Sequence, residues 1–303
     1  MQRLYAASVD TGAADKVVVQ QLGKEIDNTY RLYLFSLLYL HEICLYAQTL
    51  KEIKDTKFLK TTEDREFSDK LSSSAFAVSL EGNVSFQKAI AQFLVSPLLD
   101  ADLVRKLFAK VSERPEYVAF LDSAEPEAER KAIRSMYKKV LLKDEGFLSA
   151  VEEHFPSWDD DKNTIINLIV GTINEFYKSG AESFEGSPIY YHPAPDRTYC
   201  ETLFRKYRMS EGEFEDLYTP AFRNWDIDRI NQLDLILIGM ALCEMLYYPE
   251  IPKKVSINEY IEISKVYSTP KSKDFINGIL DNLMKKLEEE GRITKTGRGL
   301  LEN

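Results

Sequence analysis

Helical periodicity limits the fold of this chain more than any other property of its sequence. Apolar residues recur at intervals of three and four in residues 251–287, IPKKVSINEYIEISKVYSTPKSKDFINGILDNLMKKL. This spacing predicts two amphipathic helices. Thr269-Pro270 separates them, because a proline disfavours the α conformation of the residue before it.

The sequence also suggests where these two helices begin. Ser256 and Glu259 have the spacing of a capping box. Pro252 offers a competing start one turn earlier, because its fixed φ and missing N–H suit the first turn of a helix. Ser272 is the candidate N-cap of the second helix.

Helical windows cover most of the remaining chain, and no run of alternating apolar and polar residues competes with them. We therefore expect an all-α fold. Pro115 and Pro126 mark breaks between helices, and residues 127–142 have the charged, amphipathic pattern of a surface helix. The expected helices span residues 16–54, 67–80, 85–94, 97–111, 127–142, 146–155, 163–177, 197–208 and 227–246.

Composition is typical of a soluble globular protein in a reducing compartment. The chain has a net charge of −10 and three widely spaced cysteines without a C-x-x-C motif. Its N-terminus lacks a signal-peptide pattern, and its longest apolar run, 233–246, is too short and too charged to cross a bilayer. These features predict a cytoplasmic protein without a membrane segment. The acidic balance also argues against indiscriminate coating of nucleic acid, so any RNA contact must be local.

The sequence contains no motif that indicates catalysis. A Walker loop, G-x-G-x-x-G, H-E-x-x-H and G-x-S-x-G are all absent. Asp159, Asp160 and Asp161 suggest a metal site, but carboxylates at a helix N-terminus complement its exposed N–H groups and dipole, and no EF-hand spacing follows. We therefore expect neither enzymatic activity nor a metal or other cofactor.

Several residues in the 251–287 stretch are not explained by packing. Asn258, Asn277 and Gly278 are mediocre helix formers inside strongly helical windows. The pattern P-x-K-V-x-I-N-E-x-I-E-x-x-K followed by S-K-x-F-I-N-G-I-L-D resembles the C-terminal signature of the NusB family of bacterial transcription antitermination factors. The chain departs from this family at Tyr260, Ser264 and Ser268, where its members usually carry alanine or glycine.

The resemblance covers 196–287 well and 1–50 loosely, and includes the step W-D-I-D-R-I at 225–230. It implies a NusB-like fold of two packed helical bundles, here with an enlarged helical N-terminal half. We expect an N-terminal half at 1–195 with a large insertion at 51–195 of unassigned role. A NusB-like core at 196–289 and a polar disordered tail at 290–303 follow. The family's N-terminal arginine-rich run is missing, which fits either a late-assigned start or a truncation.

The resemblance also implies partners. A NusB-type factor pairs with the ribosomal protein NusE, binds the boxA element of ribosomal-RNA transcripts and joins the RNA polymerase antitermination complex. It is not an enzyme. We expect a monomer or a weak homodimer.

Candidate RNA-binding residues are Arg3, Tyr5, Lys271, Lys273 and Phe275. Cations bind phosphates and aromatic rings stack on bases, and the turn carrying the two lysines precedes a helix whose free N–H groups attract phosphate oxygens. Family positions corresponding to Tyr5, Lys271 and Phe275 lie at its RNA surface, although Lys271 replaces a commonly acidic residue. The alternative for Phe275 is a core position.

Asp234 interrupts the apolar run 233–246 and is the candidate NusE-binding residue. In the family the matching position is an acidic contact to NusE. The alternative is a solvated position on the predicted helix.

Two other functions remain. The acidic charge and the missing arginine run favour a protein-interaction scaffold without RNA binding. NusB-like domains also occur in RNA cytosine methyltransferases, but the 16 residues after Leu287 could not bind S-adenosylmethionine.

Overall fold

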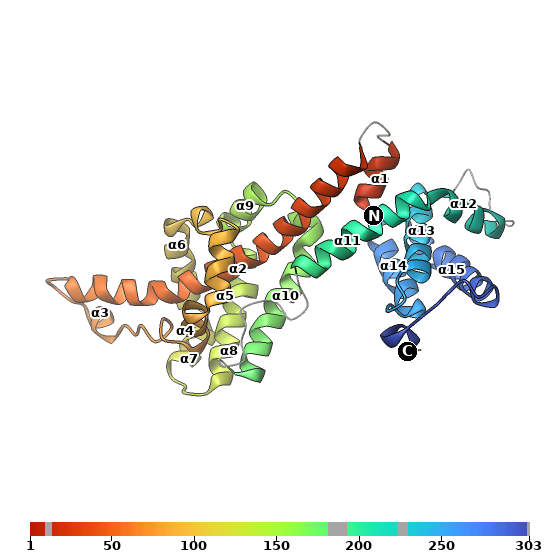
Figure 1. The fold of residues 1–303 in the computed structure, drawn as a ribbon. Coiled ribbons are helices and arrows are strands. Elements are labelled where there is room, and N and C mark those ends of the chain that lie inside the picture. Colours follow the sequence, from red (N-terminus) through yellow and green to blue (C-terminus); the bar gives the residue numbers. More distant parts are fainter. Residues whose placement is uncertain (10–13, 181–192, 223–229, 302–303) are drawn as a thin grey trace. The chain divides into compact units, whose positions relative to one another are not determined.

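A computed structural model describes residues 1–9, 14–180, 193–222 and 230–301 of the chain (Figure 1). Every regular element in these ranges is helical, which confirms the all-α prediction. The chain forms two compact units. Unit 1 contains Met1–Lys24 and Ala194–Asn303, and unit 2 contains Glu25–Pro193. The expected N-terminal half therefore differs from the structure, because residues 1–24 belong with the C-terminal core.

The long helix predicted at 16–54 is present as α2, Asp15–Thr56. Its first residues lie in unit 1, and the remainder forms the centre of unit 2. Tyr33, Phe35 and Tyr39 are fully buried there, among the largest side chains of the core. Its length agrees with the prediction because its apolar pattern continues without a proline.

Eleven further elements lie in the described residues of unit 2. The α-helices are α3 Thr62–Glu66, α4 Ala75–Gly82, α5 Val84–Gln92, α6 Ala101–Ser112, α7 Pro115–Leu121, α8 Pro126–Ser135, α9 Glu145–His154 and α10 Trp158–Ser179. A π-helical turn at Met136–Val140 and 3-10 turns at Ser96–Leu98 and Leu141–Lys143 connect some of them.

Two predictions for this unit need correction. The helix expected at 67–80 begins only at Ala75. The helix expected at 127–142 is divided into α8, the π-helical turn and a 3-10 turn, and its apolar face with Ile133, Tyr137 and Leu141 is buried. The three acids Asp159, Asp160 and Asp161 do lie in the first turn of α10, as predicted.

Unit 1 packs around the apolar helix α13, Gln232–Tyr247. Residues 225–229 of the W-D-I-D-R-I step lie outside the described residues. Helices α1, α12, α14 and α15 contact α13. Besides α13, the described residues of unit 1 form α1 Gln2–Val9, α11 Pro193–Met209, α12 Glu211–Tyr218, α14 Lys253–Tyr267, α15 Ser272–Glu289 and 3-10 turns at Thr219–Phe222 and Gly297–Leu300.

The predicted helix pair at 251–287 is confirmed, but its caps differ. Helix α14 begins after Pro252, the competing start, so Ser256 lies inside the helix and does not cap it. Helix α15 has Lys271 at its N-cap position, and Ser272 is its first residue. Both serine hydroxyls instead bind buried carboxylates on α13.

The expected disordered tail is also corrected over the residues described, which extend to 301. The amide of Thr296 donates to the carbonyl of Pro249 at 2.9 Å. Gly299 is buried so close to the same carbonyl that a Cβ atom would lie 1.9 Å from its oxygen. The segment therefore folds back on the end of α13. Within the described ranges, no helix has the length and apolar character required to cross a membrane.

Candidate nucleic-acid interface

The turn between α14 and α15, residues 268–272, is attached to the beginning of α13 by Asp234. The hydroxyl of Ser268 donates to Oδ1 of Asp234 at 2.6 Å, and the hydroxyl of Ser272 donates to Oδ2 at 2.7 Å. Hydrogen bonds to an ionised acceptor are shorter and stronger than neutral ones. One carboxylate therefore ties the end of α14 and the start of α15 to α13.

Two further side chains complete this network. Asn231 caps α13 and also donates from Nδ2 to Ser268 Oγ at 3.3 Å. Thr269 Oγ1 lies 2.8 Å from Ser272 Oγ. Because Ser272 donates its only hydroxyl proton to Asp234, Thr269 is the donor of that bond. The connected bonds give the α14–α15 turn one preferred conformation.

The turn presents two cations to solvent. Lys271 and Lys273 are exposed, and neither side chain has a hydrogen bond or ion pair with another described residue. They flank the first turn of α15, where unsatisfied N–H groups and the helix dipole attract anions. Asp274, also exposed, opposes this field. The local charge suits one or two phosphate groups.

Phe275 occupies the core of unit 1. Its side chain is 8% exposed, and its ring centroid lies 5.8 Å from that of Phe222. This burial favours the core alternative, because a nucleotide base could not reach the ring without displacing neighbouring side chains.

The other two predicted RNA-binding residues lie on a different element. Helix α1 packs against α13 through Leu4 and Ala7. The guanidinium of Arg3 donates to Gln21 at 3.0 Å, and Tyr5 is 42% exposed. The structure therefore brings the two lysines together on one turn, and it places Arg3 and Tyr5 on α1.

Asp234 is 5% exposed, so the alternative of a solvated position is wrong. Both of its carboxylate oxygens accept from serine hydroxyls. A contact between this acid and a partner protein stays a prediction. Its observed role is to hold the turn that carries the exposed lysines.

A second acid of α13, Glu244, is also buried, and its sequence context predicted no role for it. Its carboxylate accepts hydrogen bonds from the hydroxyls of Tyr199, Tyr260 and Ser256, the latter two at 2.7 Å. Burial, reinforced by the charge of Glu244, raises the pKa of Tyr260. The available signals were an acid within an apolar run and a tyrosine at Tyr260, where the family usually has a small residue.

Lys295 closes the end of α13 near this acid. Its ammonium donates to the carbonyl oxygens of Glu244 at 3.2 Å and Tyr248 at 2.9 Å. Burial lowers the pKa of Lys295 to about 8. The side chain therefore adds a second donor to two carbonyl groups at the end of α13, which already accept the backbone amides of Tyr248 and Ile251.

Comparison with known proteins bears on the same region. Residues 189–285 match the model of the NusB family. A transcription antitermination protein NusB from Salinibacter ruber is 43% identical over 105 residues, which cover 35% of this chain and 66% of that protein. The NusB proteins of Chloroherpeton thalassium and Listeria innocua are 48% identical over 79 residues and 41% identical over 85 residues.

These matches leave parts of both chains uncovered. The alignments span 26% and 28% of this chain for the last two relatives, and 37% and 66% of the relatives' own lengths. No solved structure matches this chain. Asp234, the α14–α15 turn and its two exposed lysines all lie within the matched segment. Residues 189–285 therefore form a domain of the NusB family.

Proposed function

We propose that this chain is a transcription antitermination factor that binds boxA RNA together with NusE and joins the RNA polymerase antitermination complex. The support is the NusB-family domain at 189–285 and the relatives named as transcription antitermination proteins. The chain acts by binding RNA and protein and has no enzymatic activity of its own.

The observation that carries the RNA-binding part of this proposal is the α14–α15 turn. Lys271 and Lys273 are exposed and free of ion pairs among the described residues, and Asp234 fixes the turn beneath them. A preorganised turn loses little conformational entropy when it binds phosphate. Arg3 and Tyr5 on α1 extend the RNA contact, and Phe275 supports the turn from the core.

Two cations provide only a weak RNA site. Each phosphate neutralised on a single strand contributes a log–log salt slope of about −0.7, so two contacts give a slope of about −1.4. We therefore propose that NusE is required for useful affinity, and that NusE contacts the α13 face that begins at Asp234. The direct contact involves groups near Asp234, because its carboxylate is already bonded to two serines.

Charge reversal on the turn tests this proposal. We expect Lys271→Glu with Lys273→Glu to weaken boxA binding in the presence of NusE by at least about tenfold, because two attractions become repulsions. Fluorescence anisotropy at several salt concentrations measures this, and the salt slope should become shallower.

The matched control reverses two lysines at the other end of the same helix. Lys285 and Lys286 are exposed and pair only with neighbours on or just beyond α15. Lys285→Glu with Lys286→Glu should retain boxA affinity. Equal affinity of a folded turn variant and the parent would disprove the RNA site, and the scaffold function without RNA binding would then be favoured.

A further inference from the structure

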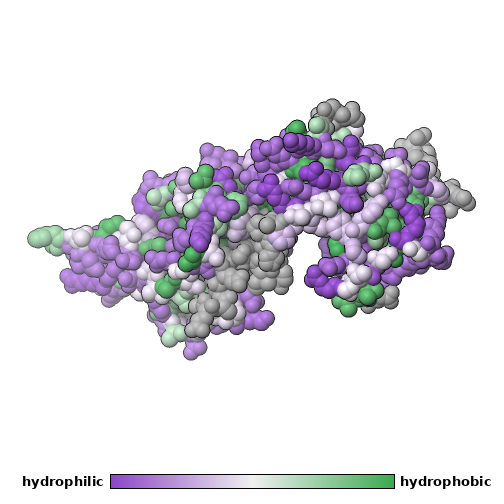
Figure 2. All heavy atoms as spheres, in the orientation of Figure 1, coloured by the Kyte–Doolittle hydropathy of each residue, from purple (hydrophilic) through white to green (hydrophobic). Residues whose placement is uncertain are grey.

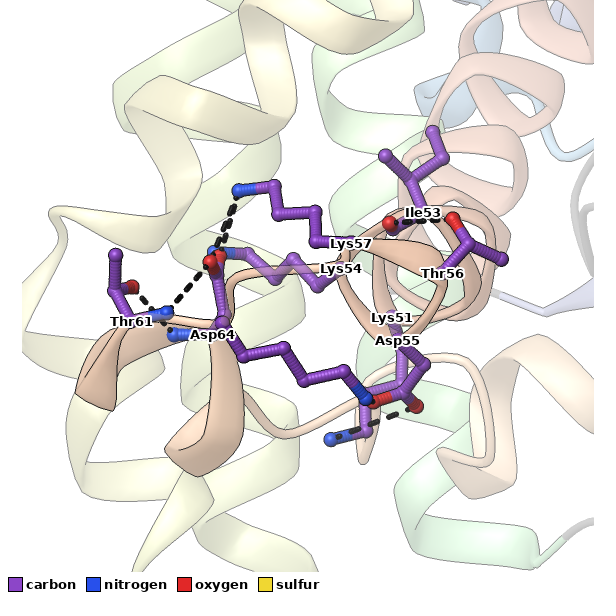
Figure 3. A network of polar contacts seen from close by, with 9 residues as sticks. Lys51, Ile53, Lys54, Asp55, Thr56, Lys57, Thr61 and Asp64 are labelled. Atoms are coloured by element: carbon purple, nitrogen blue, oxygen red, sulfur yellow. Dashed lines mark hydrogen bonds and ion pairs between the residues drawn. The ribbon is translucent and has the colours of Figure 1, made fainter.

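The hairpin formed by the end of α2, residues 57–61 and α3 projects beyond the other helices of unit 2 (Figure 1). Asp64 holds it together from inside and is 2% exposed. Its carboxylate binds the ammonium groups of Lys54 at 2.8 Å and Lys57 at 2.9 Å, and it forms a reciprocal capping box with Thr61 (Figure 3). The lysines hold the pKa of Asp64 well below its usual range.

A second carboxylate fixes the other side of the turn. Asp55 binds Lys60 at 3.0 Å and Lys51 at 3.9 Å (Figure 3). Between these two ion networks, Phe58 is 99% exposed and Leu59 is 82% exposed. Figure 2 shows hydrophobic atoms at the end of this hairpin and mainly hydrophilic atoms along its length. The networks therefore hold an aromatic and an aliphatic side chain in water.

Single exposed apolar residues are common and carry no argument by themselves. The base of the same hairpin, however, contains a cavity of about 550 Å³. Its apolar walls include the aromatic rings of Tyr46, Phe67, Phe108 and Tyr117. A cavity of this size and lining can accept large apolar side chains.

We propose that Phe58 and Leu59 of one copy of this chain occupy the cavity of a second copy, and that the second copy returns the same contact. The tip lies at one end of the hairpin, and the cavity lies at its base, against α6 and α7. Ten residues of helix separate Tyr46 from Thr56, which corresponds to about 15 Å along α2. A two-fold axis that passes between the tip and the cavity places the tip of each copy in the cavity of the other, and such a dimer is closed.

Charge favours a second copy as the occupant. Residues 51–60 carry four lysines against two acids, whereas the rest of unit 2 carries 16 lysines and arginines against 26 acids. Glu63 and Glu66 at the cavity are exposed and have no ion pair among the described residues. These acids are complementary to Lys57 and Lys60, which flank the apolar pair of the tip. The side chains of both lysines pair with Asp64 and Asp55 but stay 48% and 31% exposed, so they can also face a second acid.

The expected dimer is weak. The surface buried by two phenylalanine and two leucine side chains, together with the residues around them, approaches about 1,200 Å², the lower limit for a stable interface. The protein should therefore associate reversibly with increasing concentration. This proposal rests on unit 2 and does not depend on the proposed RNA-binding function.

Sedimentation velocity of the full chain from about 1 to about 300 µM tests the proposal. We expect a reversible monomer–dimer equilibrium whose dissociation constant rises at least about 100-fold in Phe58→Ser with Leu59→Ser, because both buried pairs are lost. Ala109→Phe, which narrows the cavity from its α6 wall, should have the same effect. The control Val84→Ser removes a 64% exposed apolar residue elsewhere on unit 2 and should leave the equilibrium unchanged.

A crosslinking experiment identifies the contact directly. Leu59→Cys and Ala109→Cys, each in a Cys200→Ser background, are mixed and treated with a short bismaleimide. A product of twice the chain mass that joins the two introduced cysteines supports the proposal. A protein that stays monomeric to about 300 µM, or a dimer unaffected by the tip and cavity variants, overturns it. Binding of the monomer to lipid vesicles through Phe58 and Leu59 would also overturn it.

Discussion

Asp234 and Glu244 are two buried acids on one helix, and they perform different tasks. Each is 5% exposed and accepts hydrogen bonds mainly from hydroxyl groups. The partners of Asp234 belong to a surface turn that carries exposed lysines. Those of Glu244 come from α11 and α14 and lie among core side chains. A buried carboxylate therefore stabilises the element that carries its donors, which is a surface turn for Asp234 and a helix junction for Glu244.

The largest effect should follow from removing the core acid. Glu244→Leu leaves the hydroxyls of Tyr199, Tyr260 and Ser256 without their acceptor, at about 1–3 kcal/mol for each unsatisfied group. We expect the free energy of unfolding to fall by at least about 3 kcal/mol, measured by urea denaturation with circular dichroism. Glu259→Leu, an exposed acid of α14, is the control and should change stability by less than about 0.5 kcal/mol. A comparable loss in both variants would contradict the assigned role.

Removal of Asp234 should lower the free energy of unfolding less than removal of Glu244, and it should weaken RNA binding. Asp234→Ala leaves the buried Ser272 and the partly exposed Ser268 without an acceptor, so we expect a loss of about 2 kcal/mol. The α14–α15 turn loses its attachment, and boxA affinity in the presence of NusE should fall at least about fivefold, because ordering the turn then opposes binding. Anisotropy under fully folded conditions measures this. Unchanged affinity would show that the turn keeps its conformation without Asp234.

Substitutions of single donor residues affect the two networks separately. Tyr260→Phe removes one buried bond to a carboxylate and should cost about 1.5 kcal/mol, whereas Ser268→Ala should cost about 1 kcal/mol because water can replace part of its bond. The two substitutions affect separate networks, so their effects on unfolding should add to within about 0.5 kcal/mol. Strong coupling in the double variant would mean that α14 transmits strain between the two acids.

The smallest expected effect concerns pH. Lys295 has a folded pKa of about 8 against an ordinary value of 10.5. Between these values the unfolded chain binds the proton more tightly, so this group makes stability rise with increasing pH. The difference in unfolding free energy between wild type and Lys295→Met should therefore shift in favour of wild type from pH 8 to 10.5. Tyrosines and cysteines titrate in the same way in both proteins, so their contributions cancel in the difference between the two unfolding free energies. A pH-independent difference would contradict the burial of this ammonium group.

Much of the fold could be predicted from sequence. Apolar spacing is a local property, so it predicted α2 and the pair α14 and α15, and the acids at 159–161 were placed correctly in the first turn of α10. The motif in 251–287 predicted the family of the C-terminal domain. Lys271 and Lys273 are exposed, and their role in RNA binding stays a prediction.

Tertiary structure decided which polar groups meet. Ser256 and Ser272 looked like helix caps, but their hydroxyls reach acids that lie 12 and 38 residues away in sequence. The residues Tyr260 and Ser268, unusual for the family, supply donors to the same two acids. Spacing along a helix cannot reveal such pairs, because they depend on how α13 and α14 pack.

The same physical reason explains the remaining differences. Phe275 carries an aromatic ring suited to base stacking, and packing against Phe222 buries it. Residues after 290 are polar in sequence, yet Thr296 and Lys295 bond to carbonyls at the end of α13. Phe58 and Leu59 look like ordinary apolar residues, and two ion networks hold them in solvent. Sequence alone determined the helices and the family, whereas long-range packing determined which residues are left to bind.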